Sequence, residues 1–389
     1  MKSSRRFFPV FLAVVLSLRC SVPVANDGGG ATETVNCRVL SSTGIPEQGA
    51  VVKLIDAGNW LEKKKNSLSV VIDSAVTDSN GVFALTADTG VVVNMQIDGF
   101  SEAVFISNFS IKSEDTTVTL RSKAVLSGNL SGPEIGAVAL FGTDYMTTIN
   151  GSSFSIQGIA PGNFPLLTRL QDSTWAFSDL VVLTDAESLE KNIEVDAQFV
   201  LVDNFDHFRL LDFSILGLIT GGNWYTYCDS LSSINAVSTP EPDRSLAVNA
   251  IVNPGLEYPY AGVGVNMARS GMTLDFSAVD TISFRARGNC SIRFSVETEK
   301  IDLLNSSHFQ KLIGLTDVWT VYEIAVSDLI LPSISESAGL GLTWEQVMSN
   351  VKRVEFDLPY DENPMGDSLG FELDDLYLKG ATLEDLILK

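Results

Sequence analysis

The chain has 389 residues, which is too long for one ordinary hydrophobic core and predicts two or three domains. Its formal net charge is −22, and removing the first 19 residues, which carry four basic and no acidic side chains, makes it −26. So acidic a surface repels nucleic acid and anionic lipid and disfavours polyanionic sugars, while it offers oxygen ligands to cations such as calcium. Short apolar runs and the lack of a long amphipathic pattern predict an all-β protein.

The N-terminus is typical of an export signal. A basic start precedes the apolar run Phe7–Leu18, which is too short to span a bilayer comfortably. Cys20 then stands where bacterial lipoproteins carry their lipid-modified cysteine, although Arg19 replaces the usual small residue. The polar segment 20–33 suits a flexible tether. We expect an exported protein anchored to a bacterial membrane through Cys20, at the cell surface or in the periplasm. The alternative is secretion with cleavage before Cys37.

Residues 34–122 show short alternating strands separated by turn sequences. The turn Gly44–Pro46 precedes the strand AVVKL at Ala50–Leu54, and TDSNGVFAL follows at Thr77–Leu85. This order resembles the carboxypeptidase regulatory-like (transthyretin-like) sandwich, in which a D-x-x-G turn precedes a strand that closes the sheet. The resemblance implies one small Ig/transthyretin-like β-sandwich.

Residues 123–198 repeat this pattern in a weaker form. The strand GAVAL at Gly136–Leu140 repeats the earlier GAVVKL, and NGSSF at Asn150–Phe154 repeats NGVF. We therefore predict a second sandwich of the same type, produced by internal duplication. Because neither copy contains a histidine or an interpretable polar cluster, each is expected to be a spacer that holds the next domain away from the membrane.

The C-terminal region carries three of the five tryptophans and both histidines. It opens with FVLVDNFDHF and closes with GFELDDLYLKG, and between them lie WYTYCD (Trp224–Asp229), DTISFRARG (Asp280–Gly288) and WTVYEIAVSDL (Trp319–Leu329). This ordered set resembles the family 11 carbohydrate-binding modules and their relatives with a galactose-binding-like jelly roll. The resemblance implies a β-jelly-roll sandwich that binds polysaccharide, and it leaves the last residues unexplained. The expected organisation is a signal peptide at 1–19, a tether at 20–33, sandwiches at 34–122 and 123–198, the jelly roll at 199–380 and a tail at 381–389.

The stretch YPYAGVGVNM at Tyr258–Met267 has an unusual strand pattern. Val263, Val265 and Met267 alternate as a buried face does, whereas the other face would carry two tyrosines, two glycines and Asn266. Glycine weakens a strand, so its presence indicates a bulge or a close approach to the backbone.

The next segment, TISFRARGNCSIRFSVETEK, predicts a hairpin. Its apolar faces match if Gly288, Asn289 and Cys290 form a three-residue loop, and the opposite face then gathers three arginines and two glutamates. Cross-strand ion pairs on an exposed face are an equal alternative to a binding role.

Placed beside that face, Tyr258 and Tyr260 offer flat surfaces for the C–H faces of a pyranose ring, and Gly262 and Gly264 leave room for it. Asn266 and the charged side chains could hydrogen-bond the hydroxyls, which cannot be desolvated without partners. The alternative is that the tyrosines pack on a loop and the glycines mark a bulge. The expected carbohydrate-binding residues are Tyr258, Tyr260, Asn266, Trp224, Tyr225, Tyr227, Arg285, Arg287 and Glu297.

An acidic set lies at the two ends of the jelly-roll region. The resemblance implies that the first and last strands are neighbours and that a structural calcium ion ties them together. Asp203, Asp206, Asp374 and Asp375 are the expected ligands, and a strand bulge is expected at Leu373–Leu376. The alternative is that these are ordinary surface aspartates. Cys228 and Cys290 either form a disulfide or remain buried thiols.

The sequence does not predict a catalytic site. Two histidines cannot build a His-rich zinc site, and there is no G-x-S-x-G, H-E-x-x-H or P-loop sequence. Glu297 and Glu299 would lie about 7 Å apart on one strand, in the range of inverting glycosidases, but nearby arginines would keep both ionised.

We therefore expect a non-catalytic protein that binds a neutral polysaccharide such as a β-glucan, with no nucleic-acid partner and with membrane contact through the lipid anchor alone. One alternative is a structural or adhesion protein whose jelly roll binds another protein. A less favoured alternative is an enzyme associated with glycoside hydrolysis. Neither the identity of the glycan nor the oligomeric state follows from the sequence.

Overall fold

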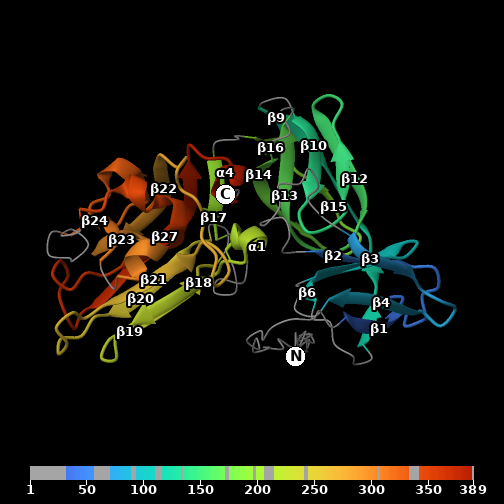
Figure 1. The fold of residues 1–389 in the computed structure, drawn as a ribbon, viewed down its shortest axis with the longest axis horizontal. Helices are drawn as coiled ribbons and strands as arrows, with labels where there is room; N and C mark the ends of the chain where they lie inside the picture. Colours follow the sequence, from blue (N-terminus) through green and yellow to red (C-terminus); the bar gives the residue numbers. More distant parts are fainter. Residues whose placement is uncertain are drawn as a thin grey trace, which may run out of the picture.

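The structure is a computed structural model. It describes residues 32–56, 71–88, 93–109, 116–132, 135–170, 175–195, 199–205, 214–240, 244–304, 307–332 and 341–387. The expected export signal, Cys20 and most of the tether lie outside the described residues. Within them the chain forms three β-sandwich units in chain order, as Figure 1 shows, so the all-β prediction is confirmed. No helix in these segments is long and apolar enough to cross a membrane.

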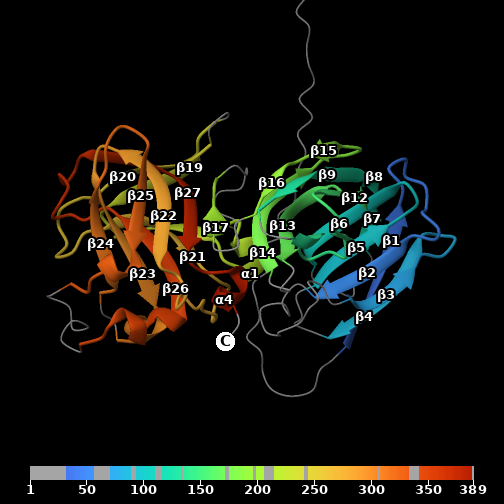
Figure 2. The same ribbon diagram turned by 90° about the horizontal axis from the view of Figure 1, so that it is seen from above.

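The first unit packs the sheet β4-β1-β7 against the sheet β3-β2-β5-β6-β8 (Figure 2). Alternating side chains from both sheets fill its core, among them Val52, Leu54, Phe83 and Ile97, which are all nearly inaccessible to solvent. Its strands are β1 (Thr32–Leu40), β2 (Val51–Asp56), β3 (Val71–Val76), β4 (Val82–Asp88), β5 (Val93–Asp98), β6 (Glu102–Phe109), β7 (Thr116–Thr119) and β8 (Arg121–Ser122).

The second unit packs the sheet β11-β10-β13-β14 against the sheet β12-β9-β15, and the short strand β16 also pairs with β9. Its strands are β9 (Ala124–Ser131), β10 (Ile135–Leu140), β11 (Met146–Thr148), β12 (Ser153–Ile159), β13 (Gly162–Leu170), β14 (Trp175–Leu183), β15 (Ser188–Glu190) and β16 (Ile193–Glu194).

The third unit is the jelly roll. Its first sheet, the β27 sheet, has the order β19-β20-β27-β22-β25, with β17 pairing with β27. Its second sheet, the β26 sheet, has the order β18-β21-β26-β23-β24. The strands are β17 (Phe199–Asp203), β18 (Trp224–Cys228), β19 (Ser233–Ser238), β20 (Leu246–Ile251), β21 (Ala261–Asn266), β22 (Thr281–Gly288), β23 (Ser291–Thr298), β24 (Phe309–Gly314), β25 (Thr320–Ala325), β26 (Val351–Asp357) and β27 (Ser368–Lys379).

Short helices connect or flank the jelly-roll strands. They are α1 (Gly217–Thr220), α2 (Glu299–Asp302), α4 (Leu383–Ile387) and the 3-10 turns η1 (Val326–Asp328), η2 (Trp344–Gln346) and η3 (Met348–Asn350). The first and last jelly-roll strands, β17 and β27, are antiparallel neighbours as expected. The predicted bulge is also present. The pairing register of β27 shifts near Asp374, and the next residue, Asp375, has a positive φ of 50°.

The predicted hairpin of β22 and β23 is wrong. β22 pairs with β25 and β27, whereas β23 pairs with β24 and β26 in the other sheet. The residues between them therefore cross from one sheet to the other. Both strands still turn their apolar faces toward the same core, where Phe284 stacks on Phe294 with ring centroids 5.7 Å apart. A hairpin and a crossover give the same alternation, so the sequence pattern does not distinguish them.

The jelly roll and the second sandwich share one buried core. A single cluster joins Ala139, Leu167 and Trp175 of the sandwich to Val200 and Leu246 of the jelly roll. The tail that the sequence left unexplained forms α4 at this junction, which lies near the centre of Figure 1, and both Leu383 and Leu386 are buried there. The side chain of Glu384 accepts a hydrogen bond of 3.1 Å from the backbone N–H of Trp175.

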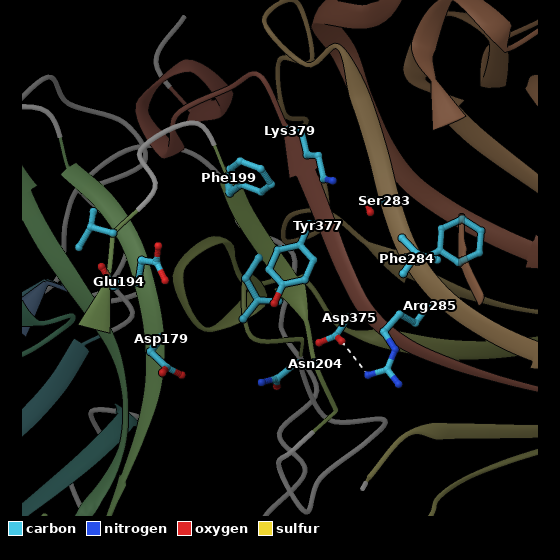
Figure 3. A pocket seen from close by; sticks show the side chains of 14 residues that line it. Asp179, Glu194, Phe199, Asn204, Ser283, Phe284, Arg285, Asp375, Tyr377 and Lys379 are labelled. Atoms are coloured by element: carbon cyan, nitrogen blue, oxygen red, sulfur yellow. Dashed lines mark hydrogen bonds and ion pairs between the residues drawn. The ribbon is translucent and has the colours of Figure 1, made fainter. Parts of the chain in front are cut away.

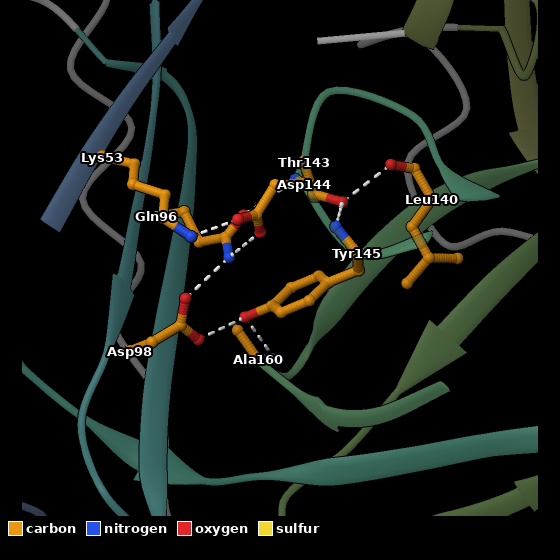
Figure 4. Close-up of polar contacts among 8 residues, drawn as sticks. All are labelled: Lys53, Gln96, Asp98, Leu140, Thr143, Asp144, Tyr145 and Ala160. Atoms are coloured by element: carbon orange, nitrogen blue, oxygen red, sulfur yellow. Dashed lines mark hydrogen bonds and ion pairs between the residues drawn. The ribbon is translucent and has the colours of Figure 1, made fainter. Parts of the chain in front are cut away.

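A polar network joins the two sandwiches (Figure 4). Gln96 of β5 donates to Asp98 at 2.7 Å and also to Asp144, which forms an ion pair with Lys53. The Tyr145 hydroxyl donates to Asp98 at 2.8 Å and accepts from a backbone N–H of the second sandwich. Both junctions are therefore built from specific side-chain contacts and not from a bare linker.

Candidate functional site

The outer face of the β26 sheet combines aromatic rings with acidic and basic groups. We call this surface the tyrosine–carboxylate face. Register places its members side by side across four strands, because Tyr225 pairs with Gly264, Gly264 with Glu355, and Glu355 with Ser295. The next row joins Tyr227, Gly262, Asp357 and Arg293 in the same way. The face consists of Tyr225, Tyr227, Gly262, Gly264, Asn266, Arg293, Ser295, Glu297, Arg353, Glu355 and Asp357.

The two glycines are explained by the tyrosine rings of β18. A β-carbon at Gly264 would lie 2.6 Å from the ring of Tyr225, and one at Gly262 would lie 2.7 Å from the ring of Tyr227. The rings therefore cover the glycine backbone of the neighbouring strand. The expectation that these glycines leave space for a sugar ring is wrong, because tyrosine side chains fill that space. The close approach to the backbone that a strand glycine indicates is present.

Two buried polar atoms beside Gly262 have no hydrogen-bond partner among the described residues. They are the hydroxyl of Tyr227 and Oδ1 of Asp357. Burial, followed by the charges of Glu355 and Asp357, raises the pKa of Tyr227, so this hydroxyl keeps its proton. Burial also raises the pKa of Asp357 to about 6, against the opposing effect of Arg293. A buried polar group without a partner costs free energy.

The next row of the face, around Glu297, is strongly coupled. Glu297 forms an ion pair with Arg353 and lies 3.7 Å from Nε2 of His308. Burial and the neighbouring charge of Glu355 outweigh Arg353 and His308 and raise the pKa of Glu297 to about 7. Burial lowers the pKa of His308 despite the two acids beside it. Glu355 accepts a hydrogen bond from the hydroxyl of Tyr225.

These positions correct part of the sequence reasoning about catalysis. Glu299 lies in α2 and is exposed, so Glu297 and Glu299 do not form a pair on one strand. The arginines expected to keep Glu297 ionised, Arg285 and Arg287, belong to β22 in the opposite sheet. Burial instead raises the pKa of Glu297.

Tyr258 and Tyr260 lie before β21, at the end of the same face. Their side chains are 62% and 45% exposed. The ring of Tyr260 lies 6.1 Å from that of Tyr227, which in turn lies 5.8 Å from Tyr225, so the three rings form a row. Asp229 fixes this end by accepting the backbone N–H of Tyr260 at 2.8 Å. Although burial opposes it, hydrogen bonds from Ser232, Tyr260 and Leu231 lower the pKa of Asp229 to about 2.

Trp224 is not part of this surface. It is 1% exposed, packs on Phe205 with ring centroids 5.0 Å apart, and donates from Nε1 to Asp203 at 2.7 Å. Its assignment to the carbohydrate-binding residues is wrong, because alternation along β18 turns it into the core while Tyr225 and Tyr227 point outward.

Arg285 and Arg287 lie on the outer face of the β27 sheet and not beside the tyrosines. Arg285 pairs with Asp374 at 3.3 Å and Asp375 at 3.1 Å, and Arg287 pairs with Glu372 at 2.7 Å. Both guanidinium groups also lie over the ring of Trp319, at 5.1 and 4.8 Å. The alternative of cross-strand ion pairs on an outer face is confirmed for these arginines, with partners from β27.

The described carboxylates of the expected calcium site do not fit calcium as they stand. Asp203 is fully buried and accepts hydrogen bonds from Trp224 and from the backbone of Phe205. Asp374 and Asp375 receive Arg285, whose positive charge opposes a cation. Asp206 lies outside the described residues. Because one of the four expected ligands is not described, calcium binding at this end of the jelly roll stays a prediction. Cys228 and Cys290 are free thiols in this structure.

Sequence reasoning missed the contribution of β26. Arg353, Glu355 and Asp357 alternate with the buried residues Val354 and Phe356, so the strand sequence VKRVEFD carried the signal. Tyr360, whose ring lies 6.4 Å from that of Tyr258, was also not predicted.

Comparison with solved structures finds carbohydrate-binding modules that overlap about half of the chain. A family 11 module of the cellulosomal cellulase Lic26A-Cel5E of Clostridium thermocellum is 17% identical, with 48% of this chain and 97% of the module covered and a TM-score of 0.34. A family 30 module of the C. thermocellum cellulase Cel9D-Cel44B is 11% identical, with 47% and 97% covered and a TM-score of 0.30. A point mutant of the family 29 module CBM29-2, complexed with mannohexaose, is 10% identical, with 49% and 97% covered and a TM-score of 0.29. No family profile and no curated protein matches the chain.

Proposed function

We propose that the tyrosine–carboxylate face binds a neutral polysaccharide such as a β-glucan without cleaving it. The observation that carries the proposal is the pairing of outward tyrosine rings with two buried polar atoms that lack partners among the described residues, the Tyr227 hydroxyl and Oδ1 of Asp357. A sugar ring supplies both complements, because its C–H faces stack on aromatic rings and its hydroxyls donate and accept hydrogen bonds.

The charges of the face favour a neutral chain over a charged one. Glu297 is ion-paired with Arg353, and Arg293 lies 3.7 Å from Asp357, so the basic groups already have acidic neighbours. An added carboxylate or sulfate would meet Glu355 and the net charge of −22 of the whole chain. The exposed rings of Tyr258 and Tyr260 extend the stacking surface beyond the strands. A neutral glucan chain therefore suits the row of tyrosines better than a uronic-acid polymer.

The test is affinity electrophoresis and calorimetry of the chain from residue 32 onward against cellulosic, mixed-linkage and β-1,3 glucans, with a mannan and a polyuronate included. The second sandwich has to be kept because it shares a core with the jelly roll. We expect neutral glucans to bind, Tyr227→Ala to lose most of this binding, and Arg287→Ala, on the opposite sheet, to retain it. Absence of binding to all five polymers would reject the proposal and favour the protein-adhesion alternative.

The non-cleaving part of the proposal has its own assay. Glu297 has a raised pKa and a neighbouring carboxylate, Glu355, which are properties that a general acid would also need. We expect no new reducing ends when the protein is incubated with its preferred glucan between pH 5 and 8. Release of reducing ends that disappears in Glu297→Gln would make the chain an enzyme.

We also propose export and lipid anchoring through Cys20, which rests on the N-terminal sequence alone. Mass spectrometry of the native protein is expected to find diacylated Cys20 as the first residue. An unmodified Cys20, or a mature start beyond it, would remove the anchor while leaving the glycan proposal intact.

A further inference from the structure

A cavity of about 600 Å³ lies where the second sandwich meets the jelly roll. Figure 3 shows Asp179 and Glu194 on the sandwich side, and Phe199, Tyr377, Lys379 and Arg285 on the jelly-roll side. We call this cavity the seam pocket. Its jelly-roll wall is the outer face of the β27 sheet, so the pocket is on the opposite side of the jelly roll from the tyrosine–carboxylate face.

The two walls of the seam pocket are fixed relative to each other. Leu167, Trp175 and Leu180 of the sandwich belong to the same buried cluster as Val200 and Leu201 of the jelly roll. The helix α4 also packs on β14, the strand that carries Asp179. A pocket with rigid walls is preformed, so a ligand does not have to pay for closing the two domains.

The charged groups of the pocket are mostly balanced by partners within the protein. Asp375 receives Arg285 at 3.1 Å, Lys379 is held by Glu323 at 2.6 Å, and Asp179 is held by Lys191 at 2.6 Å. A charged ligand would have to displace one of these ion pairs. A neutral ligand with many hydroxyls could instead use the remaining lone pairs and N–H groups without breaking them.

The pocket also presents apolar surface that remains in contact with water. Phe199 is 36% exposed and Val321 is 59% exposed. Tyr377 adds a second aromatic ring at the centre of the pocket, as Figure 3 shows. The volume lies in the range of about 300–1,000 Å³ that is usual for small-molecule sites. Apolar surface beside hydrogen-bonding groups is the combination that a pyranose ring requires.

We propose that the seam pocket is a second binding site, which takes a short neutral saccharide of one to three sugar units or the end of a longer chain. This site does not depend on the tyrosine–carboxylate face, because the two sites share no residue and lie on different sheets. A protein with both sites would hold a polysaccharide chain on one face and a chain end or second chain at the domain junction.

The test separates the two sites by variants measured with the same probes. Cellotetraose, laminaritetraose and mannotetraose are titrated by calorimetry into the chain from residue 32 onward and into Tyr227→Ala, which leaves the seam pocket unchanged. We expect Tyr227→Ala still to bind at least one probe with a stoichiometry near one. Adding Glu194→Gln is expected to weaken that binding several-fold, and adding Tyr377→Ala to weaken it by roughly fivefold or more.

Glu190→Gln is the matched control, since Glu190 is an exposed glutamate of the same sandwich outside the pocket and its loss changes the charge equally. Melting curves check that Tyr377→Ala folds. If Tyr377→Ala unfolds, the sugar affinity of Glu194→Gln still tests the seam pocket. If Tyr227→Ala binds none of the three sugars, or binds them equally with and without Glu194→Gln and Tyr377→Ala, the seam pocket is a domain junction only. If the wild-type chain binds these sugars and Tyr227→Ala binds none of them, this inference is overturned while the proposed function is supported.

Discussion

Both outer faces of the jelly roll carry charged side chains, but the polar groups of the two faces differ in how far they are satisfied. On the β27 sheet, Arg285 and Arg287 each have an acidic partner on the adjacent strand β27 and lie over Trp319. On the β26 sheet, Asp357 and Tyr227 each keep a buried polar atom without a hydrogen-bond partner among the described residues. The arginines of the first face have partners within the protein, whereas these two buried polar atoms of the second face have none in the part of the chain that the structure describes.

This difference shows why the density of charges along a strand is a poor guide to binding. Arg285 and Arg287 were expected to bind sugar because they alternate with a buried face, but their partners come from a strand distant in sequence. Whether a polar group is available depends on the neighbouring strand, and the neighbour is fixed by the sheet order.

The largest expected effect comes from breaking the contact between glycine and tyrosine. In Gly264→Ala the added methyl would meet the Tyr225 ring at 2.6 Å, so the ring must leave its position. Overpacking of this kind costs about 1–3 kcal/mol of stability. We expect glucan binding to fall by more than tenfold, together with a lower melting temperature.

Gly314→Ala is the matched control for that variant. Gly314 lies on β24 of the same sheet, and a β-carbon there would meet no atom within 4 Å. Calorimetry and melting curves should show it near wild type. Equal behaviour of Gly264→Ala and Gly314→Ala would contradict the role of the ring over the glycine.

The second effect is a dependence of stability on pH that arises on the tyrosine–carboxylate face. The folded-state pKa values of Glu297, about 7, and Asp357, about 6, lie above those of the unfolded chain. The folded protein therefore holds protons that the unfolded chain releases. The stabilising contribution of these groups is complete below about pH 4 and is lost as the pH rises through about 6 to 7.

We expect Glu297→Gln to flatten this dependence. Between pH 5 and 8, the loss of unfolding free energy in the variant should be smaller than in the wild type by on the order of 2 kcal/mol. Chemical denaturation followed by tryptophan fluorescence measures it, with the exposed neighbour Glu299→Gln as the control. Parallel pH profiles for the wild type and Glu297→Gln would show that Glu297 is not perturbed by burial.

A third, smaller effect concerns the rim of the face. Tyr260 is 45% exposed and its ring lies 6.1 Å from that of Tyr227. Tyr260→Ala should weaken glucan binding by about 1 kcal/mol, or roughly fivefold, while the melting temperature stays unchanged. Unfolding of the variant would instead make this tyrosine a structural residue.

Much of the fold was predictable from the sequence because alternation is local. The buried positions Val263, Val265 and Met267 and the bulge at Asp374 follow from period-two patterns that one strand carries by itself. The partner of each strand was not predictable. β22 and β23 face one core from two sheets, and the same alternation also fits a hairpin.

The candidate site was predictable to the same extent. Tyr225, Tyr227, Asn266 and Glu297 do lie together, because each points outward from a strand of the β26 sheet. Trp224 was assigned to the outer face, although alternation along β18 places it in the core beside the outward Tyr225. The strand β26 was overlooked because its charged residues lie about ninety positions from Gly264 in the sequence. Only the pairing of strands distant in sequence brings Glu355 beside Gly264.

The smallest expected effect concerns the outer face of the β27 sheet, where the arginines have acidic partners within the protein. Arg287 and Glu372 are 41% and 25% exposed at the side chain, so their ion pair is partly screened by water. Arg287→Ala should therefore lower the unfolding free energy by less than about 1 kcal/mol, partly through lost contact with Trp319. Glucan affinity should not change, since Arg287 is on the opposite sheet from the tyrosines. A large loss of glucan affinity in Arg287→Ala, with the fold intact, would move the polysaccharide site to the β27 sheet and reverse the comparison between the two faces.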